Sequence, residues 1–374
     1  MKLLATVKPG FTSLSPDRNT VASFDREGRL YAYFKRGVAY RRSLASTVEV
    51  RWREGSRRRS RLTPTQAAEL FAEAYAVAAQ CRPHTDAAVR ARLDEEILRW
   101  TPERLLGEAE RFARVYKPIS ILPPDQYLSI VLQATEGCTW NRCTFCSFYQ
   151  GRPFRAKSPE EFAAHAAAVR QFLGKGTLMR RGIFLADGNA LALSQSRLES
   201  LMDIAAQAFP GEPVFGFIDV YTGERRPVEG WRRLADLGLK RVYIGMETGL
   251  DELLHFLNKP GSRDELVRFV SDLKAAALEV GLIVMIGAGG AEYRESHAEA
   301  TLSAIAQMPL GRGDLVYLSP FIEQPGSMYI ARRREAALTP LAEPEIESEL
   351  KRLAESIRAM GIKAARYDIR ESIY

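Results

Sequence analysis

The chain has 374 residues, of which 46% are hydrophobic and 26% are charged. These proportions are ordinary for a folded protein and exclude a largely disordered chain. The formal net charge of +7 and the pI of about 9.2 favour an acidic partner, but the excess is small for a chain of this length. No stretch approaches the roughly 20 apolar residues of a membrane span, and the start lacks the apolar core of a signal peptide, so we expect a cytoplasmic protein without membrane contact.

Residues 1–117 predict a module of β-strands followed by helices. Three short runs between residues 21 and 42 alternate apolar and polar side chains, with turn residues between them. The helical part contains an apolar stripe with spacings of four, three and four residues, formed by Leu70, Ala74, Val77 and Cys81. Thr101 and Pro102 then mark the start of a further helix.

Six arginines cluster in the segment that follows these expected strands, at positions 51, 53, 57, 58, 59 and 61. Such a cluster, with Arg57–Arg59 at its centre, is typical of a surface that binds RNA or another polyanion. It is equally typical of solvated arginines on a β-hairpin, and a run of like charges usually has no partner.

Residues 118–338 predict a different architecture, in which short apolar runs alternate with helical patterns. Alternation of this kind indicates parallel strands, and six units predict an α/β fold with a partial (β/α)6 TIM-like barrel. One helix start is explicit, because Ser158-Pro159-Glu160-Glu161 combines a capping box with proline at the first helical position. Six strands are expected, at residues 127–134, 182–186, 214–220, 242–245, 282–287 and 315–318.

Residues 339–374 predict a helix and a tail. The helix carries one apolar stripe with alternating spacings of four and three, so it should pack on the barrel. The stripe consists of Ile346, Leu350, Leu353, Ile357 and Met360.

Three of the four cysteines, Cys138, Cys143 and Cys146, fall within nine residues directly after the first expected barrel strand. This spacing is unlike a disulfide framework, and thiolates are soft ligands suited to iron–sulfur clusters or zinc. Three thiols on one loop can hold three irons of a [4Fe–4S] cluster and leave the fourth iron open to a substrate. The alternative is a zinc site in a nucleic-acid-binding protein, with Cys81 and His84 completing Cys143 and Cys146.

The segment Gly137-Cys138-Thr139-Trp140-Asn141-Arg142-Cys143-Thr144-Phe145-Cys146 resembles the cluster motif of the radical S-adenosylmethionine superfamily. The wider family has three residues between its first two cysteines, whereas this chain has four and matches a subset with Cys-x4-Cys-x2-Cys spacing. In this resemblance Phe145 takes the position that lies against the adenine. Simple packing within the loop is the other reading of Phe145.

Downstream segments extend the resemblance and imply further contacts to S-adenosylmethionine. Asp187, Gly188 and Asn189 stand where the superfamily commonly has Gly-Gly-Glu, a motif that engages the methionine amine, although Asp-Gly is also an ordinary turn. Asp219 and Glu247 follow the third and fourth strands, where carboxylates can accept from ribose hydroxyls or an ammonium, or can serve a loop cap or ion pair. After the fifth strand, a glycine run allows close backbone approach or forms only a tight turn; its members include Gly287 and Gly289.

The resemblance implies reductive cleavage of S-adenosylmethionine to a 5′-deoxyadenosyl radical, which takes a hydrogen atom from an unidentified substrate. Cluster and cofactor carry this chemistry, while the protein positions them and excludes water. An external electron donor such as ferredoxin or flavodoxin is implied as well.

Overall fold

The computed structural model describes residues 4–371 and 373–374, with only the backbone described at Ser56 and Arg57. Its first unit is a seven-stranded antiparallel sheet in which each strand pairs with the next along the chain. The strands are β1 Leu4–Val7, β2 Phe11–Asp17, β3 Thr20–Asp25, β4 Leu30–Lys35, β5 Val38–Arg42, β6 Val48–Glu54 and β7 Ser56–Arg61.

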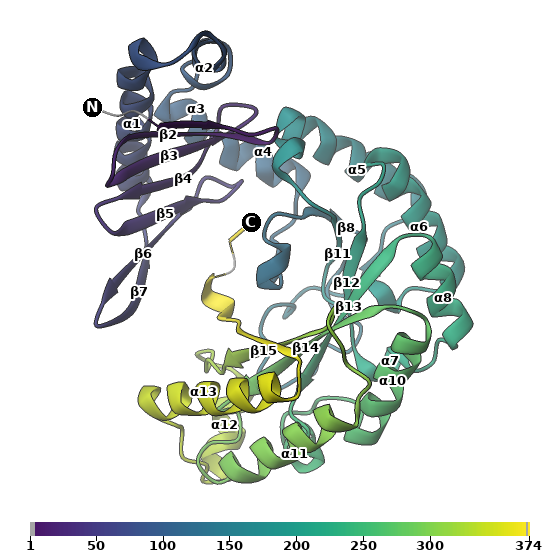
Figure 1. Cartoon of the computed structure of the whole chain (residues 1–374). Coiled ribbons are helices and arrows are strands. Elements are labelled where there is room, and N and C mark those ends of the chain that lie inside the picture. The colour runs from purple at the N-terminus through teal and green to yellow at the C-terminus, as the bar shows by residue number, and fades with distance from the viewer. Residues whose placement is uncertain (1–3, 372) are drawn as a thin grey trace.

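Four helices follow this sheet, and the first of them covers one of its faces (Figure 1). Helix α1 (Pro64–Cys81) is capped by Thr63, whose side chain forms a reciprocal capping box with Gln66. The expected stripe faces the sheet, with Leu70, Ala74 and Cys81 buried there and Val77 partly buried. The shorter helices are α2 Ala87–Arg92, α3 Pro102–Leu106 and α4 Glu108–Val115.

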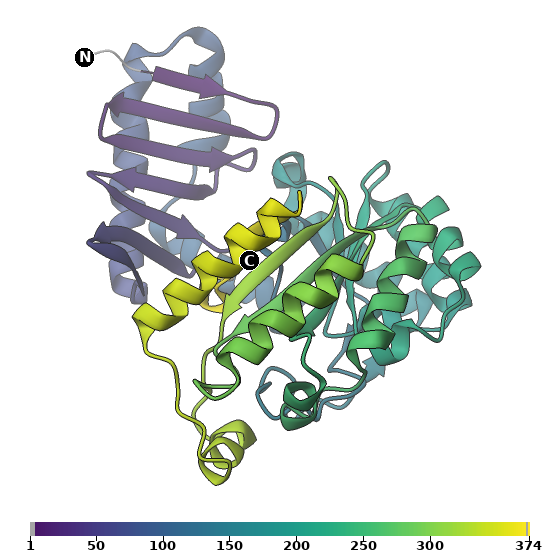
Figure 2. The same cartoon turned by 60° about the horizontal axis from the view of Figure 1, so that its bottom comes forward.

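The second unit is a seven-stranded parallel sheet that curves into a partial barrel, in the order β16-β15-β14-β13-β12-β11-β8. Figures 1 and 2 show helices along its outer side and a gap between its two edges. The predicted α/β barrel class is therefore confirmed. The strands are β8 Ile130–Gln133, β11 Ile183–Ala186, β12 Val214–Ile218, β13 Leu239–Glu247, β14 Glu279–Ile286, β15 Leu315–Pro320 and β16 Lys363–Arg366.

The barrel helices connect these parallel strands. Helix α5 begins as the sequence predicts, since Glu161 N donates to Ser158 Oγ and Ser158 N donates to Glu161 Oε2. A two-stranded ribbon of β9 (Thr135–Glu136) and β10 (Arg155–Ala156) flanks the loop after β8. The helices are α5 Pro159–Leu173, α6 Gln195–Ala208, α7 Val220–Gly223, α8 Val228–Asp236, α9 Asp251–Phe256, α10 Arg263–Ala275, α11 Arg294–Gln307, α12 Met328–Glu335 and α13 Glu343–Ala359.

The C-terminal region differs from the expected helix and tail in two respects. Strand β16 adds a seventh barrel strand beside β15, where only six strands were expected. Helix α13 packs on the barrel through Leu350, Leu353 and Ile357, but Met360 is 41% exposed because the helix has already ended at Ala359. The expected boundaries at residues 117 and 338 remain predictions.

Candidate active site

The cysteine loop after β8 is fixed by hydrogen bonds to the segment that follows α9. Trp140 Nε1 donates to Asn258 O at 2.9 Å, and Asn258 Nδ2 donates to Arg142 O at 2.8 Å. Thr144 N also donates to Leu257 O at 3.0 Å. Two segments more than a hundred residues apart thus form one platform for the thiols.

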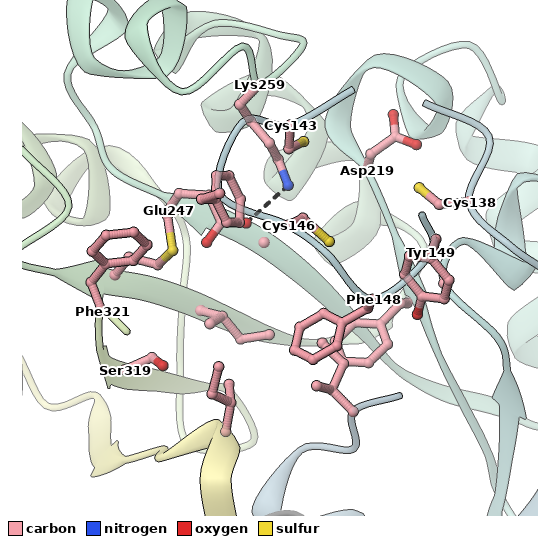
Figure 3. A pocket seen from close by; sticks show the side chains of 18 of the residues that line it. Cys138, Cys143, Cys146, Phe148, Tyr149, Asp219, Glu247, Lys259, Ser319 and Phe321 are labelled. Atoms are coloured by element: carbon pink, nitrogen blue, oxygen red, sulfur yellow. Dashed lines mark hydrogen bonds and ion pairs between the residues drawn. The ribbon is translucent and has the colours of Figure 1, made fainter. Parts of the chain in front are cut away.

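All three thiols of this loop line one cavity of about 180 Å³ at the carboxyl ends of the barrel strands (Figure 3). Cys138, Cys143 and Cys146 are free and partly exposed. Burial raises the pKa of Cys143 to about 12 and also raises the pKa of Cys146. Both thiols are therefore protonated at neutral pH until an electropositive group displaces the proton.

Polar and glycine residues from three other strand ends meet the thiols in this cavity. Gly188 and Asn189 follow β11, Asp219 follows β12, and Glu247 ends β13. Phe145, from the cysteine loop itself, also lines the cavity and packs against a small apolar cluster that includes Leu253 and Tyr329. Apolar side chains form much of the remaining wall, among them Phe148, Ile283, Met285 and Phe321.

Glu247 forms a buried ion pair with Lys259, whose Nζ donates to Glu247 Oε1 at 2.9 Å (Figure 3). Burial alone would lower the pKa of Lys259, but the charge of Glu247 raises that pKa above its ordinary value. Within residues 4–371 and 373–374, Oε2 of Glu247 has no hydrogen-bond or ion-pair partner. This oxygen is therefore available to a ligand.

The sequence did not single out Lys259, because a lysine before Pro260-Gly261 is commonly a helix-terminal cation. In the structure the side chain and the backbone carbonyl of Asn258 both bond to the cysteine loop, which places the next residue in the cavity. The available signal was that Asn258-Lys259-Pro260-Gly261 resembles a segment of the same Cys-x4-Cys-x2-Cys subset.

Asn189 and Asp219 are hydrogen-bonded to one another. Asn189 Nδ2 donates to Asp219 Oδ2 and to Thr139 Oγ1, while Asp219 N donates to Asn189 Oδ1 at 2.9 Å. Asp219 also caps α7, since its Oδ1 accepts from Thr222 N at 2.7 Å. Both side chains face the cavity, but their polar atoms already have protein partners.

Asp187 lies behind the cavity wall and does not line it. Its Oδ1 accepts from Tyr149 at 3.3 Å, and Arg152 Nη1 is 3.9 Å from its Oδ2. Burial raises the pKa of Asp187 to about 6. Gly188 sits where a Cβ atom would meet Gly137 O at 2.9 Å, so the close backbone approach there requires glycine.

Gly287 and Gly289 line a different, smaller hollow together with His297. The structure therefore does not bring them into the cavity that holds the thiols. Gly289 instead allows Tyr293 to pack against the backbone, because a Cβ atom would lie 2.5 Å from Tyr293 Cβ.

The zinc alternative is wrong in this structure. Cys81 is fully buried in the core of the N-terminal module, whereas Cys143 and Cys146 line the barrel cavity. In the described part of the chain, no three His, Cys, Asp or Glu side chains converge closely enough to hold one metal ion. A closed zinc site needs four such ligands, while three free thiols around one cavity fit a larger group such as a [4Fe–4S] cluster.

Two arginines of the expected polyanion-binding surface form ion pairs within the chain. Arg59 Nη1 lies 2.8 Å from Asp368 Oδ2, and Arg51 pairs with Glu49 and Glu371. Arg58 is exposed, and the side chain of Arg57 lies outside what the structure describes. None of the helices within the described ranges has the length and apolar character needed to cross a membrane.

Residues 132–301 match the family model described as the Radical SAM superfamily. No curated protein sequence matches the chain. One solved structure, OxsB with aqua-cobalamin and S-adenosylmethionine bound, is titled a cobalamin-dependent S-adenosylmethionine radical enzyme. It is 13% identical with a TM-score of 0.43, and the match covers 70% of this chain and 38% of OxsB.

Two further solved structures have comparable values. Coproporphyrinogen III oxidase (HemN) from Escherichia coli, titled a radical SAM enzyme, is 13% identical with a TM-score of 0.47, over 68% of this chain and 56% of HemN. The radical S-adenosylmethionine methyltransferase TsrM from Kitasatospora setae is 15% identical with a TM-score of 0.42, over 60% of this chain and 44% of TsrM. The chain thus spans less than two thirds of each of these proteins.

Proposed function

This chain carries a radical SAM superfamily domain over residues 132–301, and from that premise we propose that it binds a [4Fe–4S] cluster through Cys138, Cys143 and Cys146 and reductively cleaves S-adenosylmethionine. One observation carries the proposal. Three thiols of a single loop line the same cavity as polar residues from three other strand ends. In TIM-like barrels, the carboxyl ends of the strands are where active sites are built.

Bound at this mouth, the cluster and S-adenosylmethionine would supply an electron and a 5′-deoxyadenosyl radical that takes hydrogen from a substrate. The chain's own residues hold and shield these groups. Phe148, Ile283 and Phe321 line the wall and keep water from the reacting centre. Phe145, on the cysteine loop, offers an apolar ring to the adenine.

Glu247 is the acceptor that we assign to S-adenosylmethionine. Its Oε1 is held by Lys259, which fixes the carboxylate and leaves Oε2 to accept from ribose hydroxyls or the methionine ammonium. Asp219 and Asn189 form part of the same wall and fix each other's side chains, because their polar atoms are bonded to one another. Asp187 orients Tyr149 and thereby the cysteine loop. A reductant such as ferredoxin or flavodoxin would deliver the electron.

Anaerobic purification tests the proposal. The reconstituted protein should be brown and contain about four irons per chain, because three thiolates suit an open cubane. Addition of dithionite and S-adenosylmethionine should give 5′-deoxyadenosine, measured by chromatography. One zinc per chain, with no iron after reconstitution, would overturn the assignment.

The same reaction can identify the substrate. Candidate compounds are supplied in deuterated form, and deuterium in the 5′-deoxyadenosine identifies the compound from which hydrogen is taken. Deuterium that appears with one compound and not with its unlabelled form assigns the substrate. Formation of 5′-deoxyadenosine that no compound accelerates or labels rejects the set tested.

A further inference from the structure

A second cavity lies at the opposite end of the barrel, between the N-terminal sheet and the segments that precede β8 and β11. Its volume is about 940 Å³. Tyr31 and Arg41 reach it from β4 and β5, while Tyr127 stands just before β8 and Arg181 just before β11. The cysteine loop follows the carboxyl end of β8, so the two cavities are at opposite ends of the same strand.

Arg41 is held at the wall of this cleft by two aromatic rings. Its guanidinium carbon is 5.6 Å from the centre of the Tyr31 ring and 5.2 Å from that of Tyr127. Stacking of this kind fixes the plane of a guanidinium and leaves its N–H groups free at the edges. Burial, together with the nearby cations Arg51 and Arg180, lowers the pKa of Arg41.

Arg180 stands beside Arg41 in a small hollow that continues the cleft, since both share Tyr31, Arg41, Tyr127 and Met179. Arg180 is only 8% exposed, and its buried Nε has no hydrogen-bond partner. Its guanidinium lies over the ring of Tyr374, with 5.1 Å between the guanidinium carbon and the ring centre. A buried donor without a partner is costly and calls for an acceptor.

Two carboxylates, Asp125 and Asp25, line the cleft and its hollow, but neither forms an ion pair with the cations there. Within the described residues no ion pair involves Lys8, Arg41, Arg180 or Arg181. The nearby carboxylates are already engaged: Asp125 accepts from Tyr317 at 2.7 Å and from Arg241 at 2.8 Å, and Asp25 pairs with Arg29 at 3.1 Å. Glu49 pairs with Arg51 through its Oε1, while its buried Oε2 has no hydrogen-bond partner within the described residues.

We propose that this cleft binds a small phosphorylated molecule, with its phosphate groups on Arg41 and Arg180. The forked donors of arginine match phosphate oxygens, and a phosphate supplies acceptors where the protein has none. Part of the wall of the cleft is apolar and includes Phe11, Met179 and Leu178, which is 56% exposed. A nucleoside diphosphate combines both features, with the phosphates on the arginines and the base on the apolar wall.

Isothermal titration of the full-length, anaerobically reconstituted protein with adenosine 5′-diphosphate tests this site. We expect saturable one-to-one binding at low salt, with pyrophosphate binding more weakly because it lacks the base. Arg41→Met and Arg180→Met should each weaken binding at least tenfold. Arg58→Met changes an exposed arginine of the same module outside the cleft and should change affinity less than twofold.

Arg41 and Arg180 are largely buried, so their variants could lose binding through misfolding. Arg181 lines the cleft but is exposed, so Arg181→Met should fold normally and still weaken binding about threefold. Circular dichroism verifies the fold of each variant. The proposal is overturned if neither probe gives saturable binding, or if Arg58→Met weakens binding as much as Arg180→Met. It is also overturned if only a single-stranded RNA binds, with an affinity that falls steeply with salt. The titration does not use the cysteine cavity, so its failure leaves the proposed function untouched.

Discussion

The two cavities lie at opposite ends of one parallel sheet. They differ in whether their charged side chains have partners within the protein. At the carboxyl end Lys259 pairs with Glu247, and Asp219 is bonded to Asn189. At the amino end Arg41 and Arg180 have no ion-pair partner within the described residues. A cavity with compensated charge suits a ligand that carries both signs, whereas uncompensated cations favour a net anion. The difference therefore indicates two ligands of different chemistry.

The largest expected effect separates the cysteine cavity from the rest of the chain. Cys143→Ala should reduce iron from about four per chain to nearly none, because two thiolates do not hold a cubane. Cys81→Ala is the matched control, since Cys81 is buried in the N-terminal core and should leave iron unchanged. Iron analysis after anaerobic reconstitution measures both. Loss of iron in the Cys81 variant would contradict the assignment.

Removing the charge compensation at the carboxyl end is the next largest change. Lys259→Met leaves Glu247 buried without its cation and should lower the free energy of unfolding by about 3–5 kcal/mol. The double variant with Glu247→Gln should recover part of that loss, since the uncompensated charge is gone. Urea denaturation of the wild type and the two variants gives the comparison. Equal stability of Lys259→Met and the wild type would mean that solvent reaches the pair.

The stability of the protein should depend on pH through His165, which contacts strand β8 of the barrel sheet. Gln133 N donates to Nε2 of His165 at 3.0 Å, and burial lowers the pKa of His165 to about 4. The unfolded imidazole binds a proton near its ordinary pKa of about 6.5, whereas folded His165 stays neutral, so stability falls as the pH drops from 6.5 to 4. The expected loss is about 3 kcal/mol at pH 4.

The matched variant is His165→Gln, which keeps an acceptor for Gln133 but does not titrate. Urea denaturation at several pH values from 7 to 4 should show a shallower fall than in the wild type. A fall of the same size in both proteins would assign the acid sensitivity to other groups.

Glu247→Gln sharpens the assignment of the ligand contact. Iron content should stay intact, while affinity for S-adenosylmethionine falls by about 1.5–3 kcal/mol, or roughly ten- to a hundredfold, because a charge-assisted hydrogen bond is lost. Asp187→Asn should have a smaller effect, since Asp187 lies behind the wall. Equilibrium dialysis without oxygen measures both affinities. An unchanged affinity in Glu247→Gln would make that residue structural.

The smallest expected effect concerns the arginine hairpin. Arg59→Met removes a partly exposed ion pair with Asp368 and should cost less than about 1 kcal/mol of stability, since Arg370 still pairs with Asp368. Binding of adenosine 5′-diphosphate should be unchanged, because Arg59 does not line the cleft. A clear loss of that binding would extend the cationic site to the hairpin and weaken the contrast between paired and unpaired arginines.

The sequence predicted the features that depend on local pattern and on strand direction. The cysteine loop falls at the end of a strand, and Asp219 and Glu247 fall at the ends of two others, so parallel pairing alone brings them to one mouth. Strand β16 was missed because Lys363–Arg366 shows little apolar alternation and buries only Ala364. Lys259 was missed because its position depends on contacts between the cysteine loop and a segment over a hundred residues away.

The same limit applies to the glycines and to the amino-end cleft. Gly287 and Gly289 follow a strand as expected, yet the turn after β14 directs them into another hollow. Arg41 and Arg180 belong to different units, and no spacing in the sequence relates them. Tertiary docking of the two units creates that site.

Tyr374 protects the open edge of the barrel. Val131 N, on edge strand β8, donates to Tyr374 Oη at 3.0 Å, and Tyr116 Oη donates to Val131 O at 3.1 Å. An unpaired strand edge is a template for aggregation, and these two hydroxyls satisfy the N–H and C=O of Val131 without closing the barrel. Val131 and Tyr374 are 243 positions apart, so this protection of the strand edge is a long-range contact that forms only when the C-terminal segment has packed against β8.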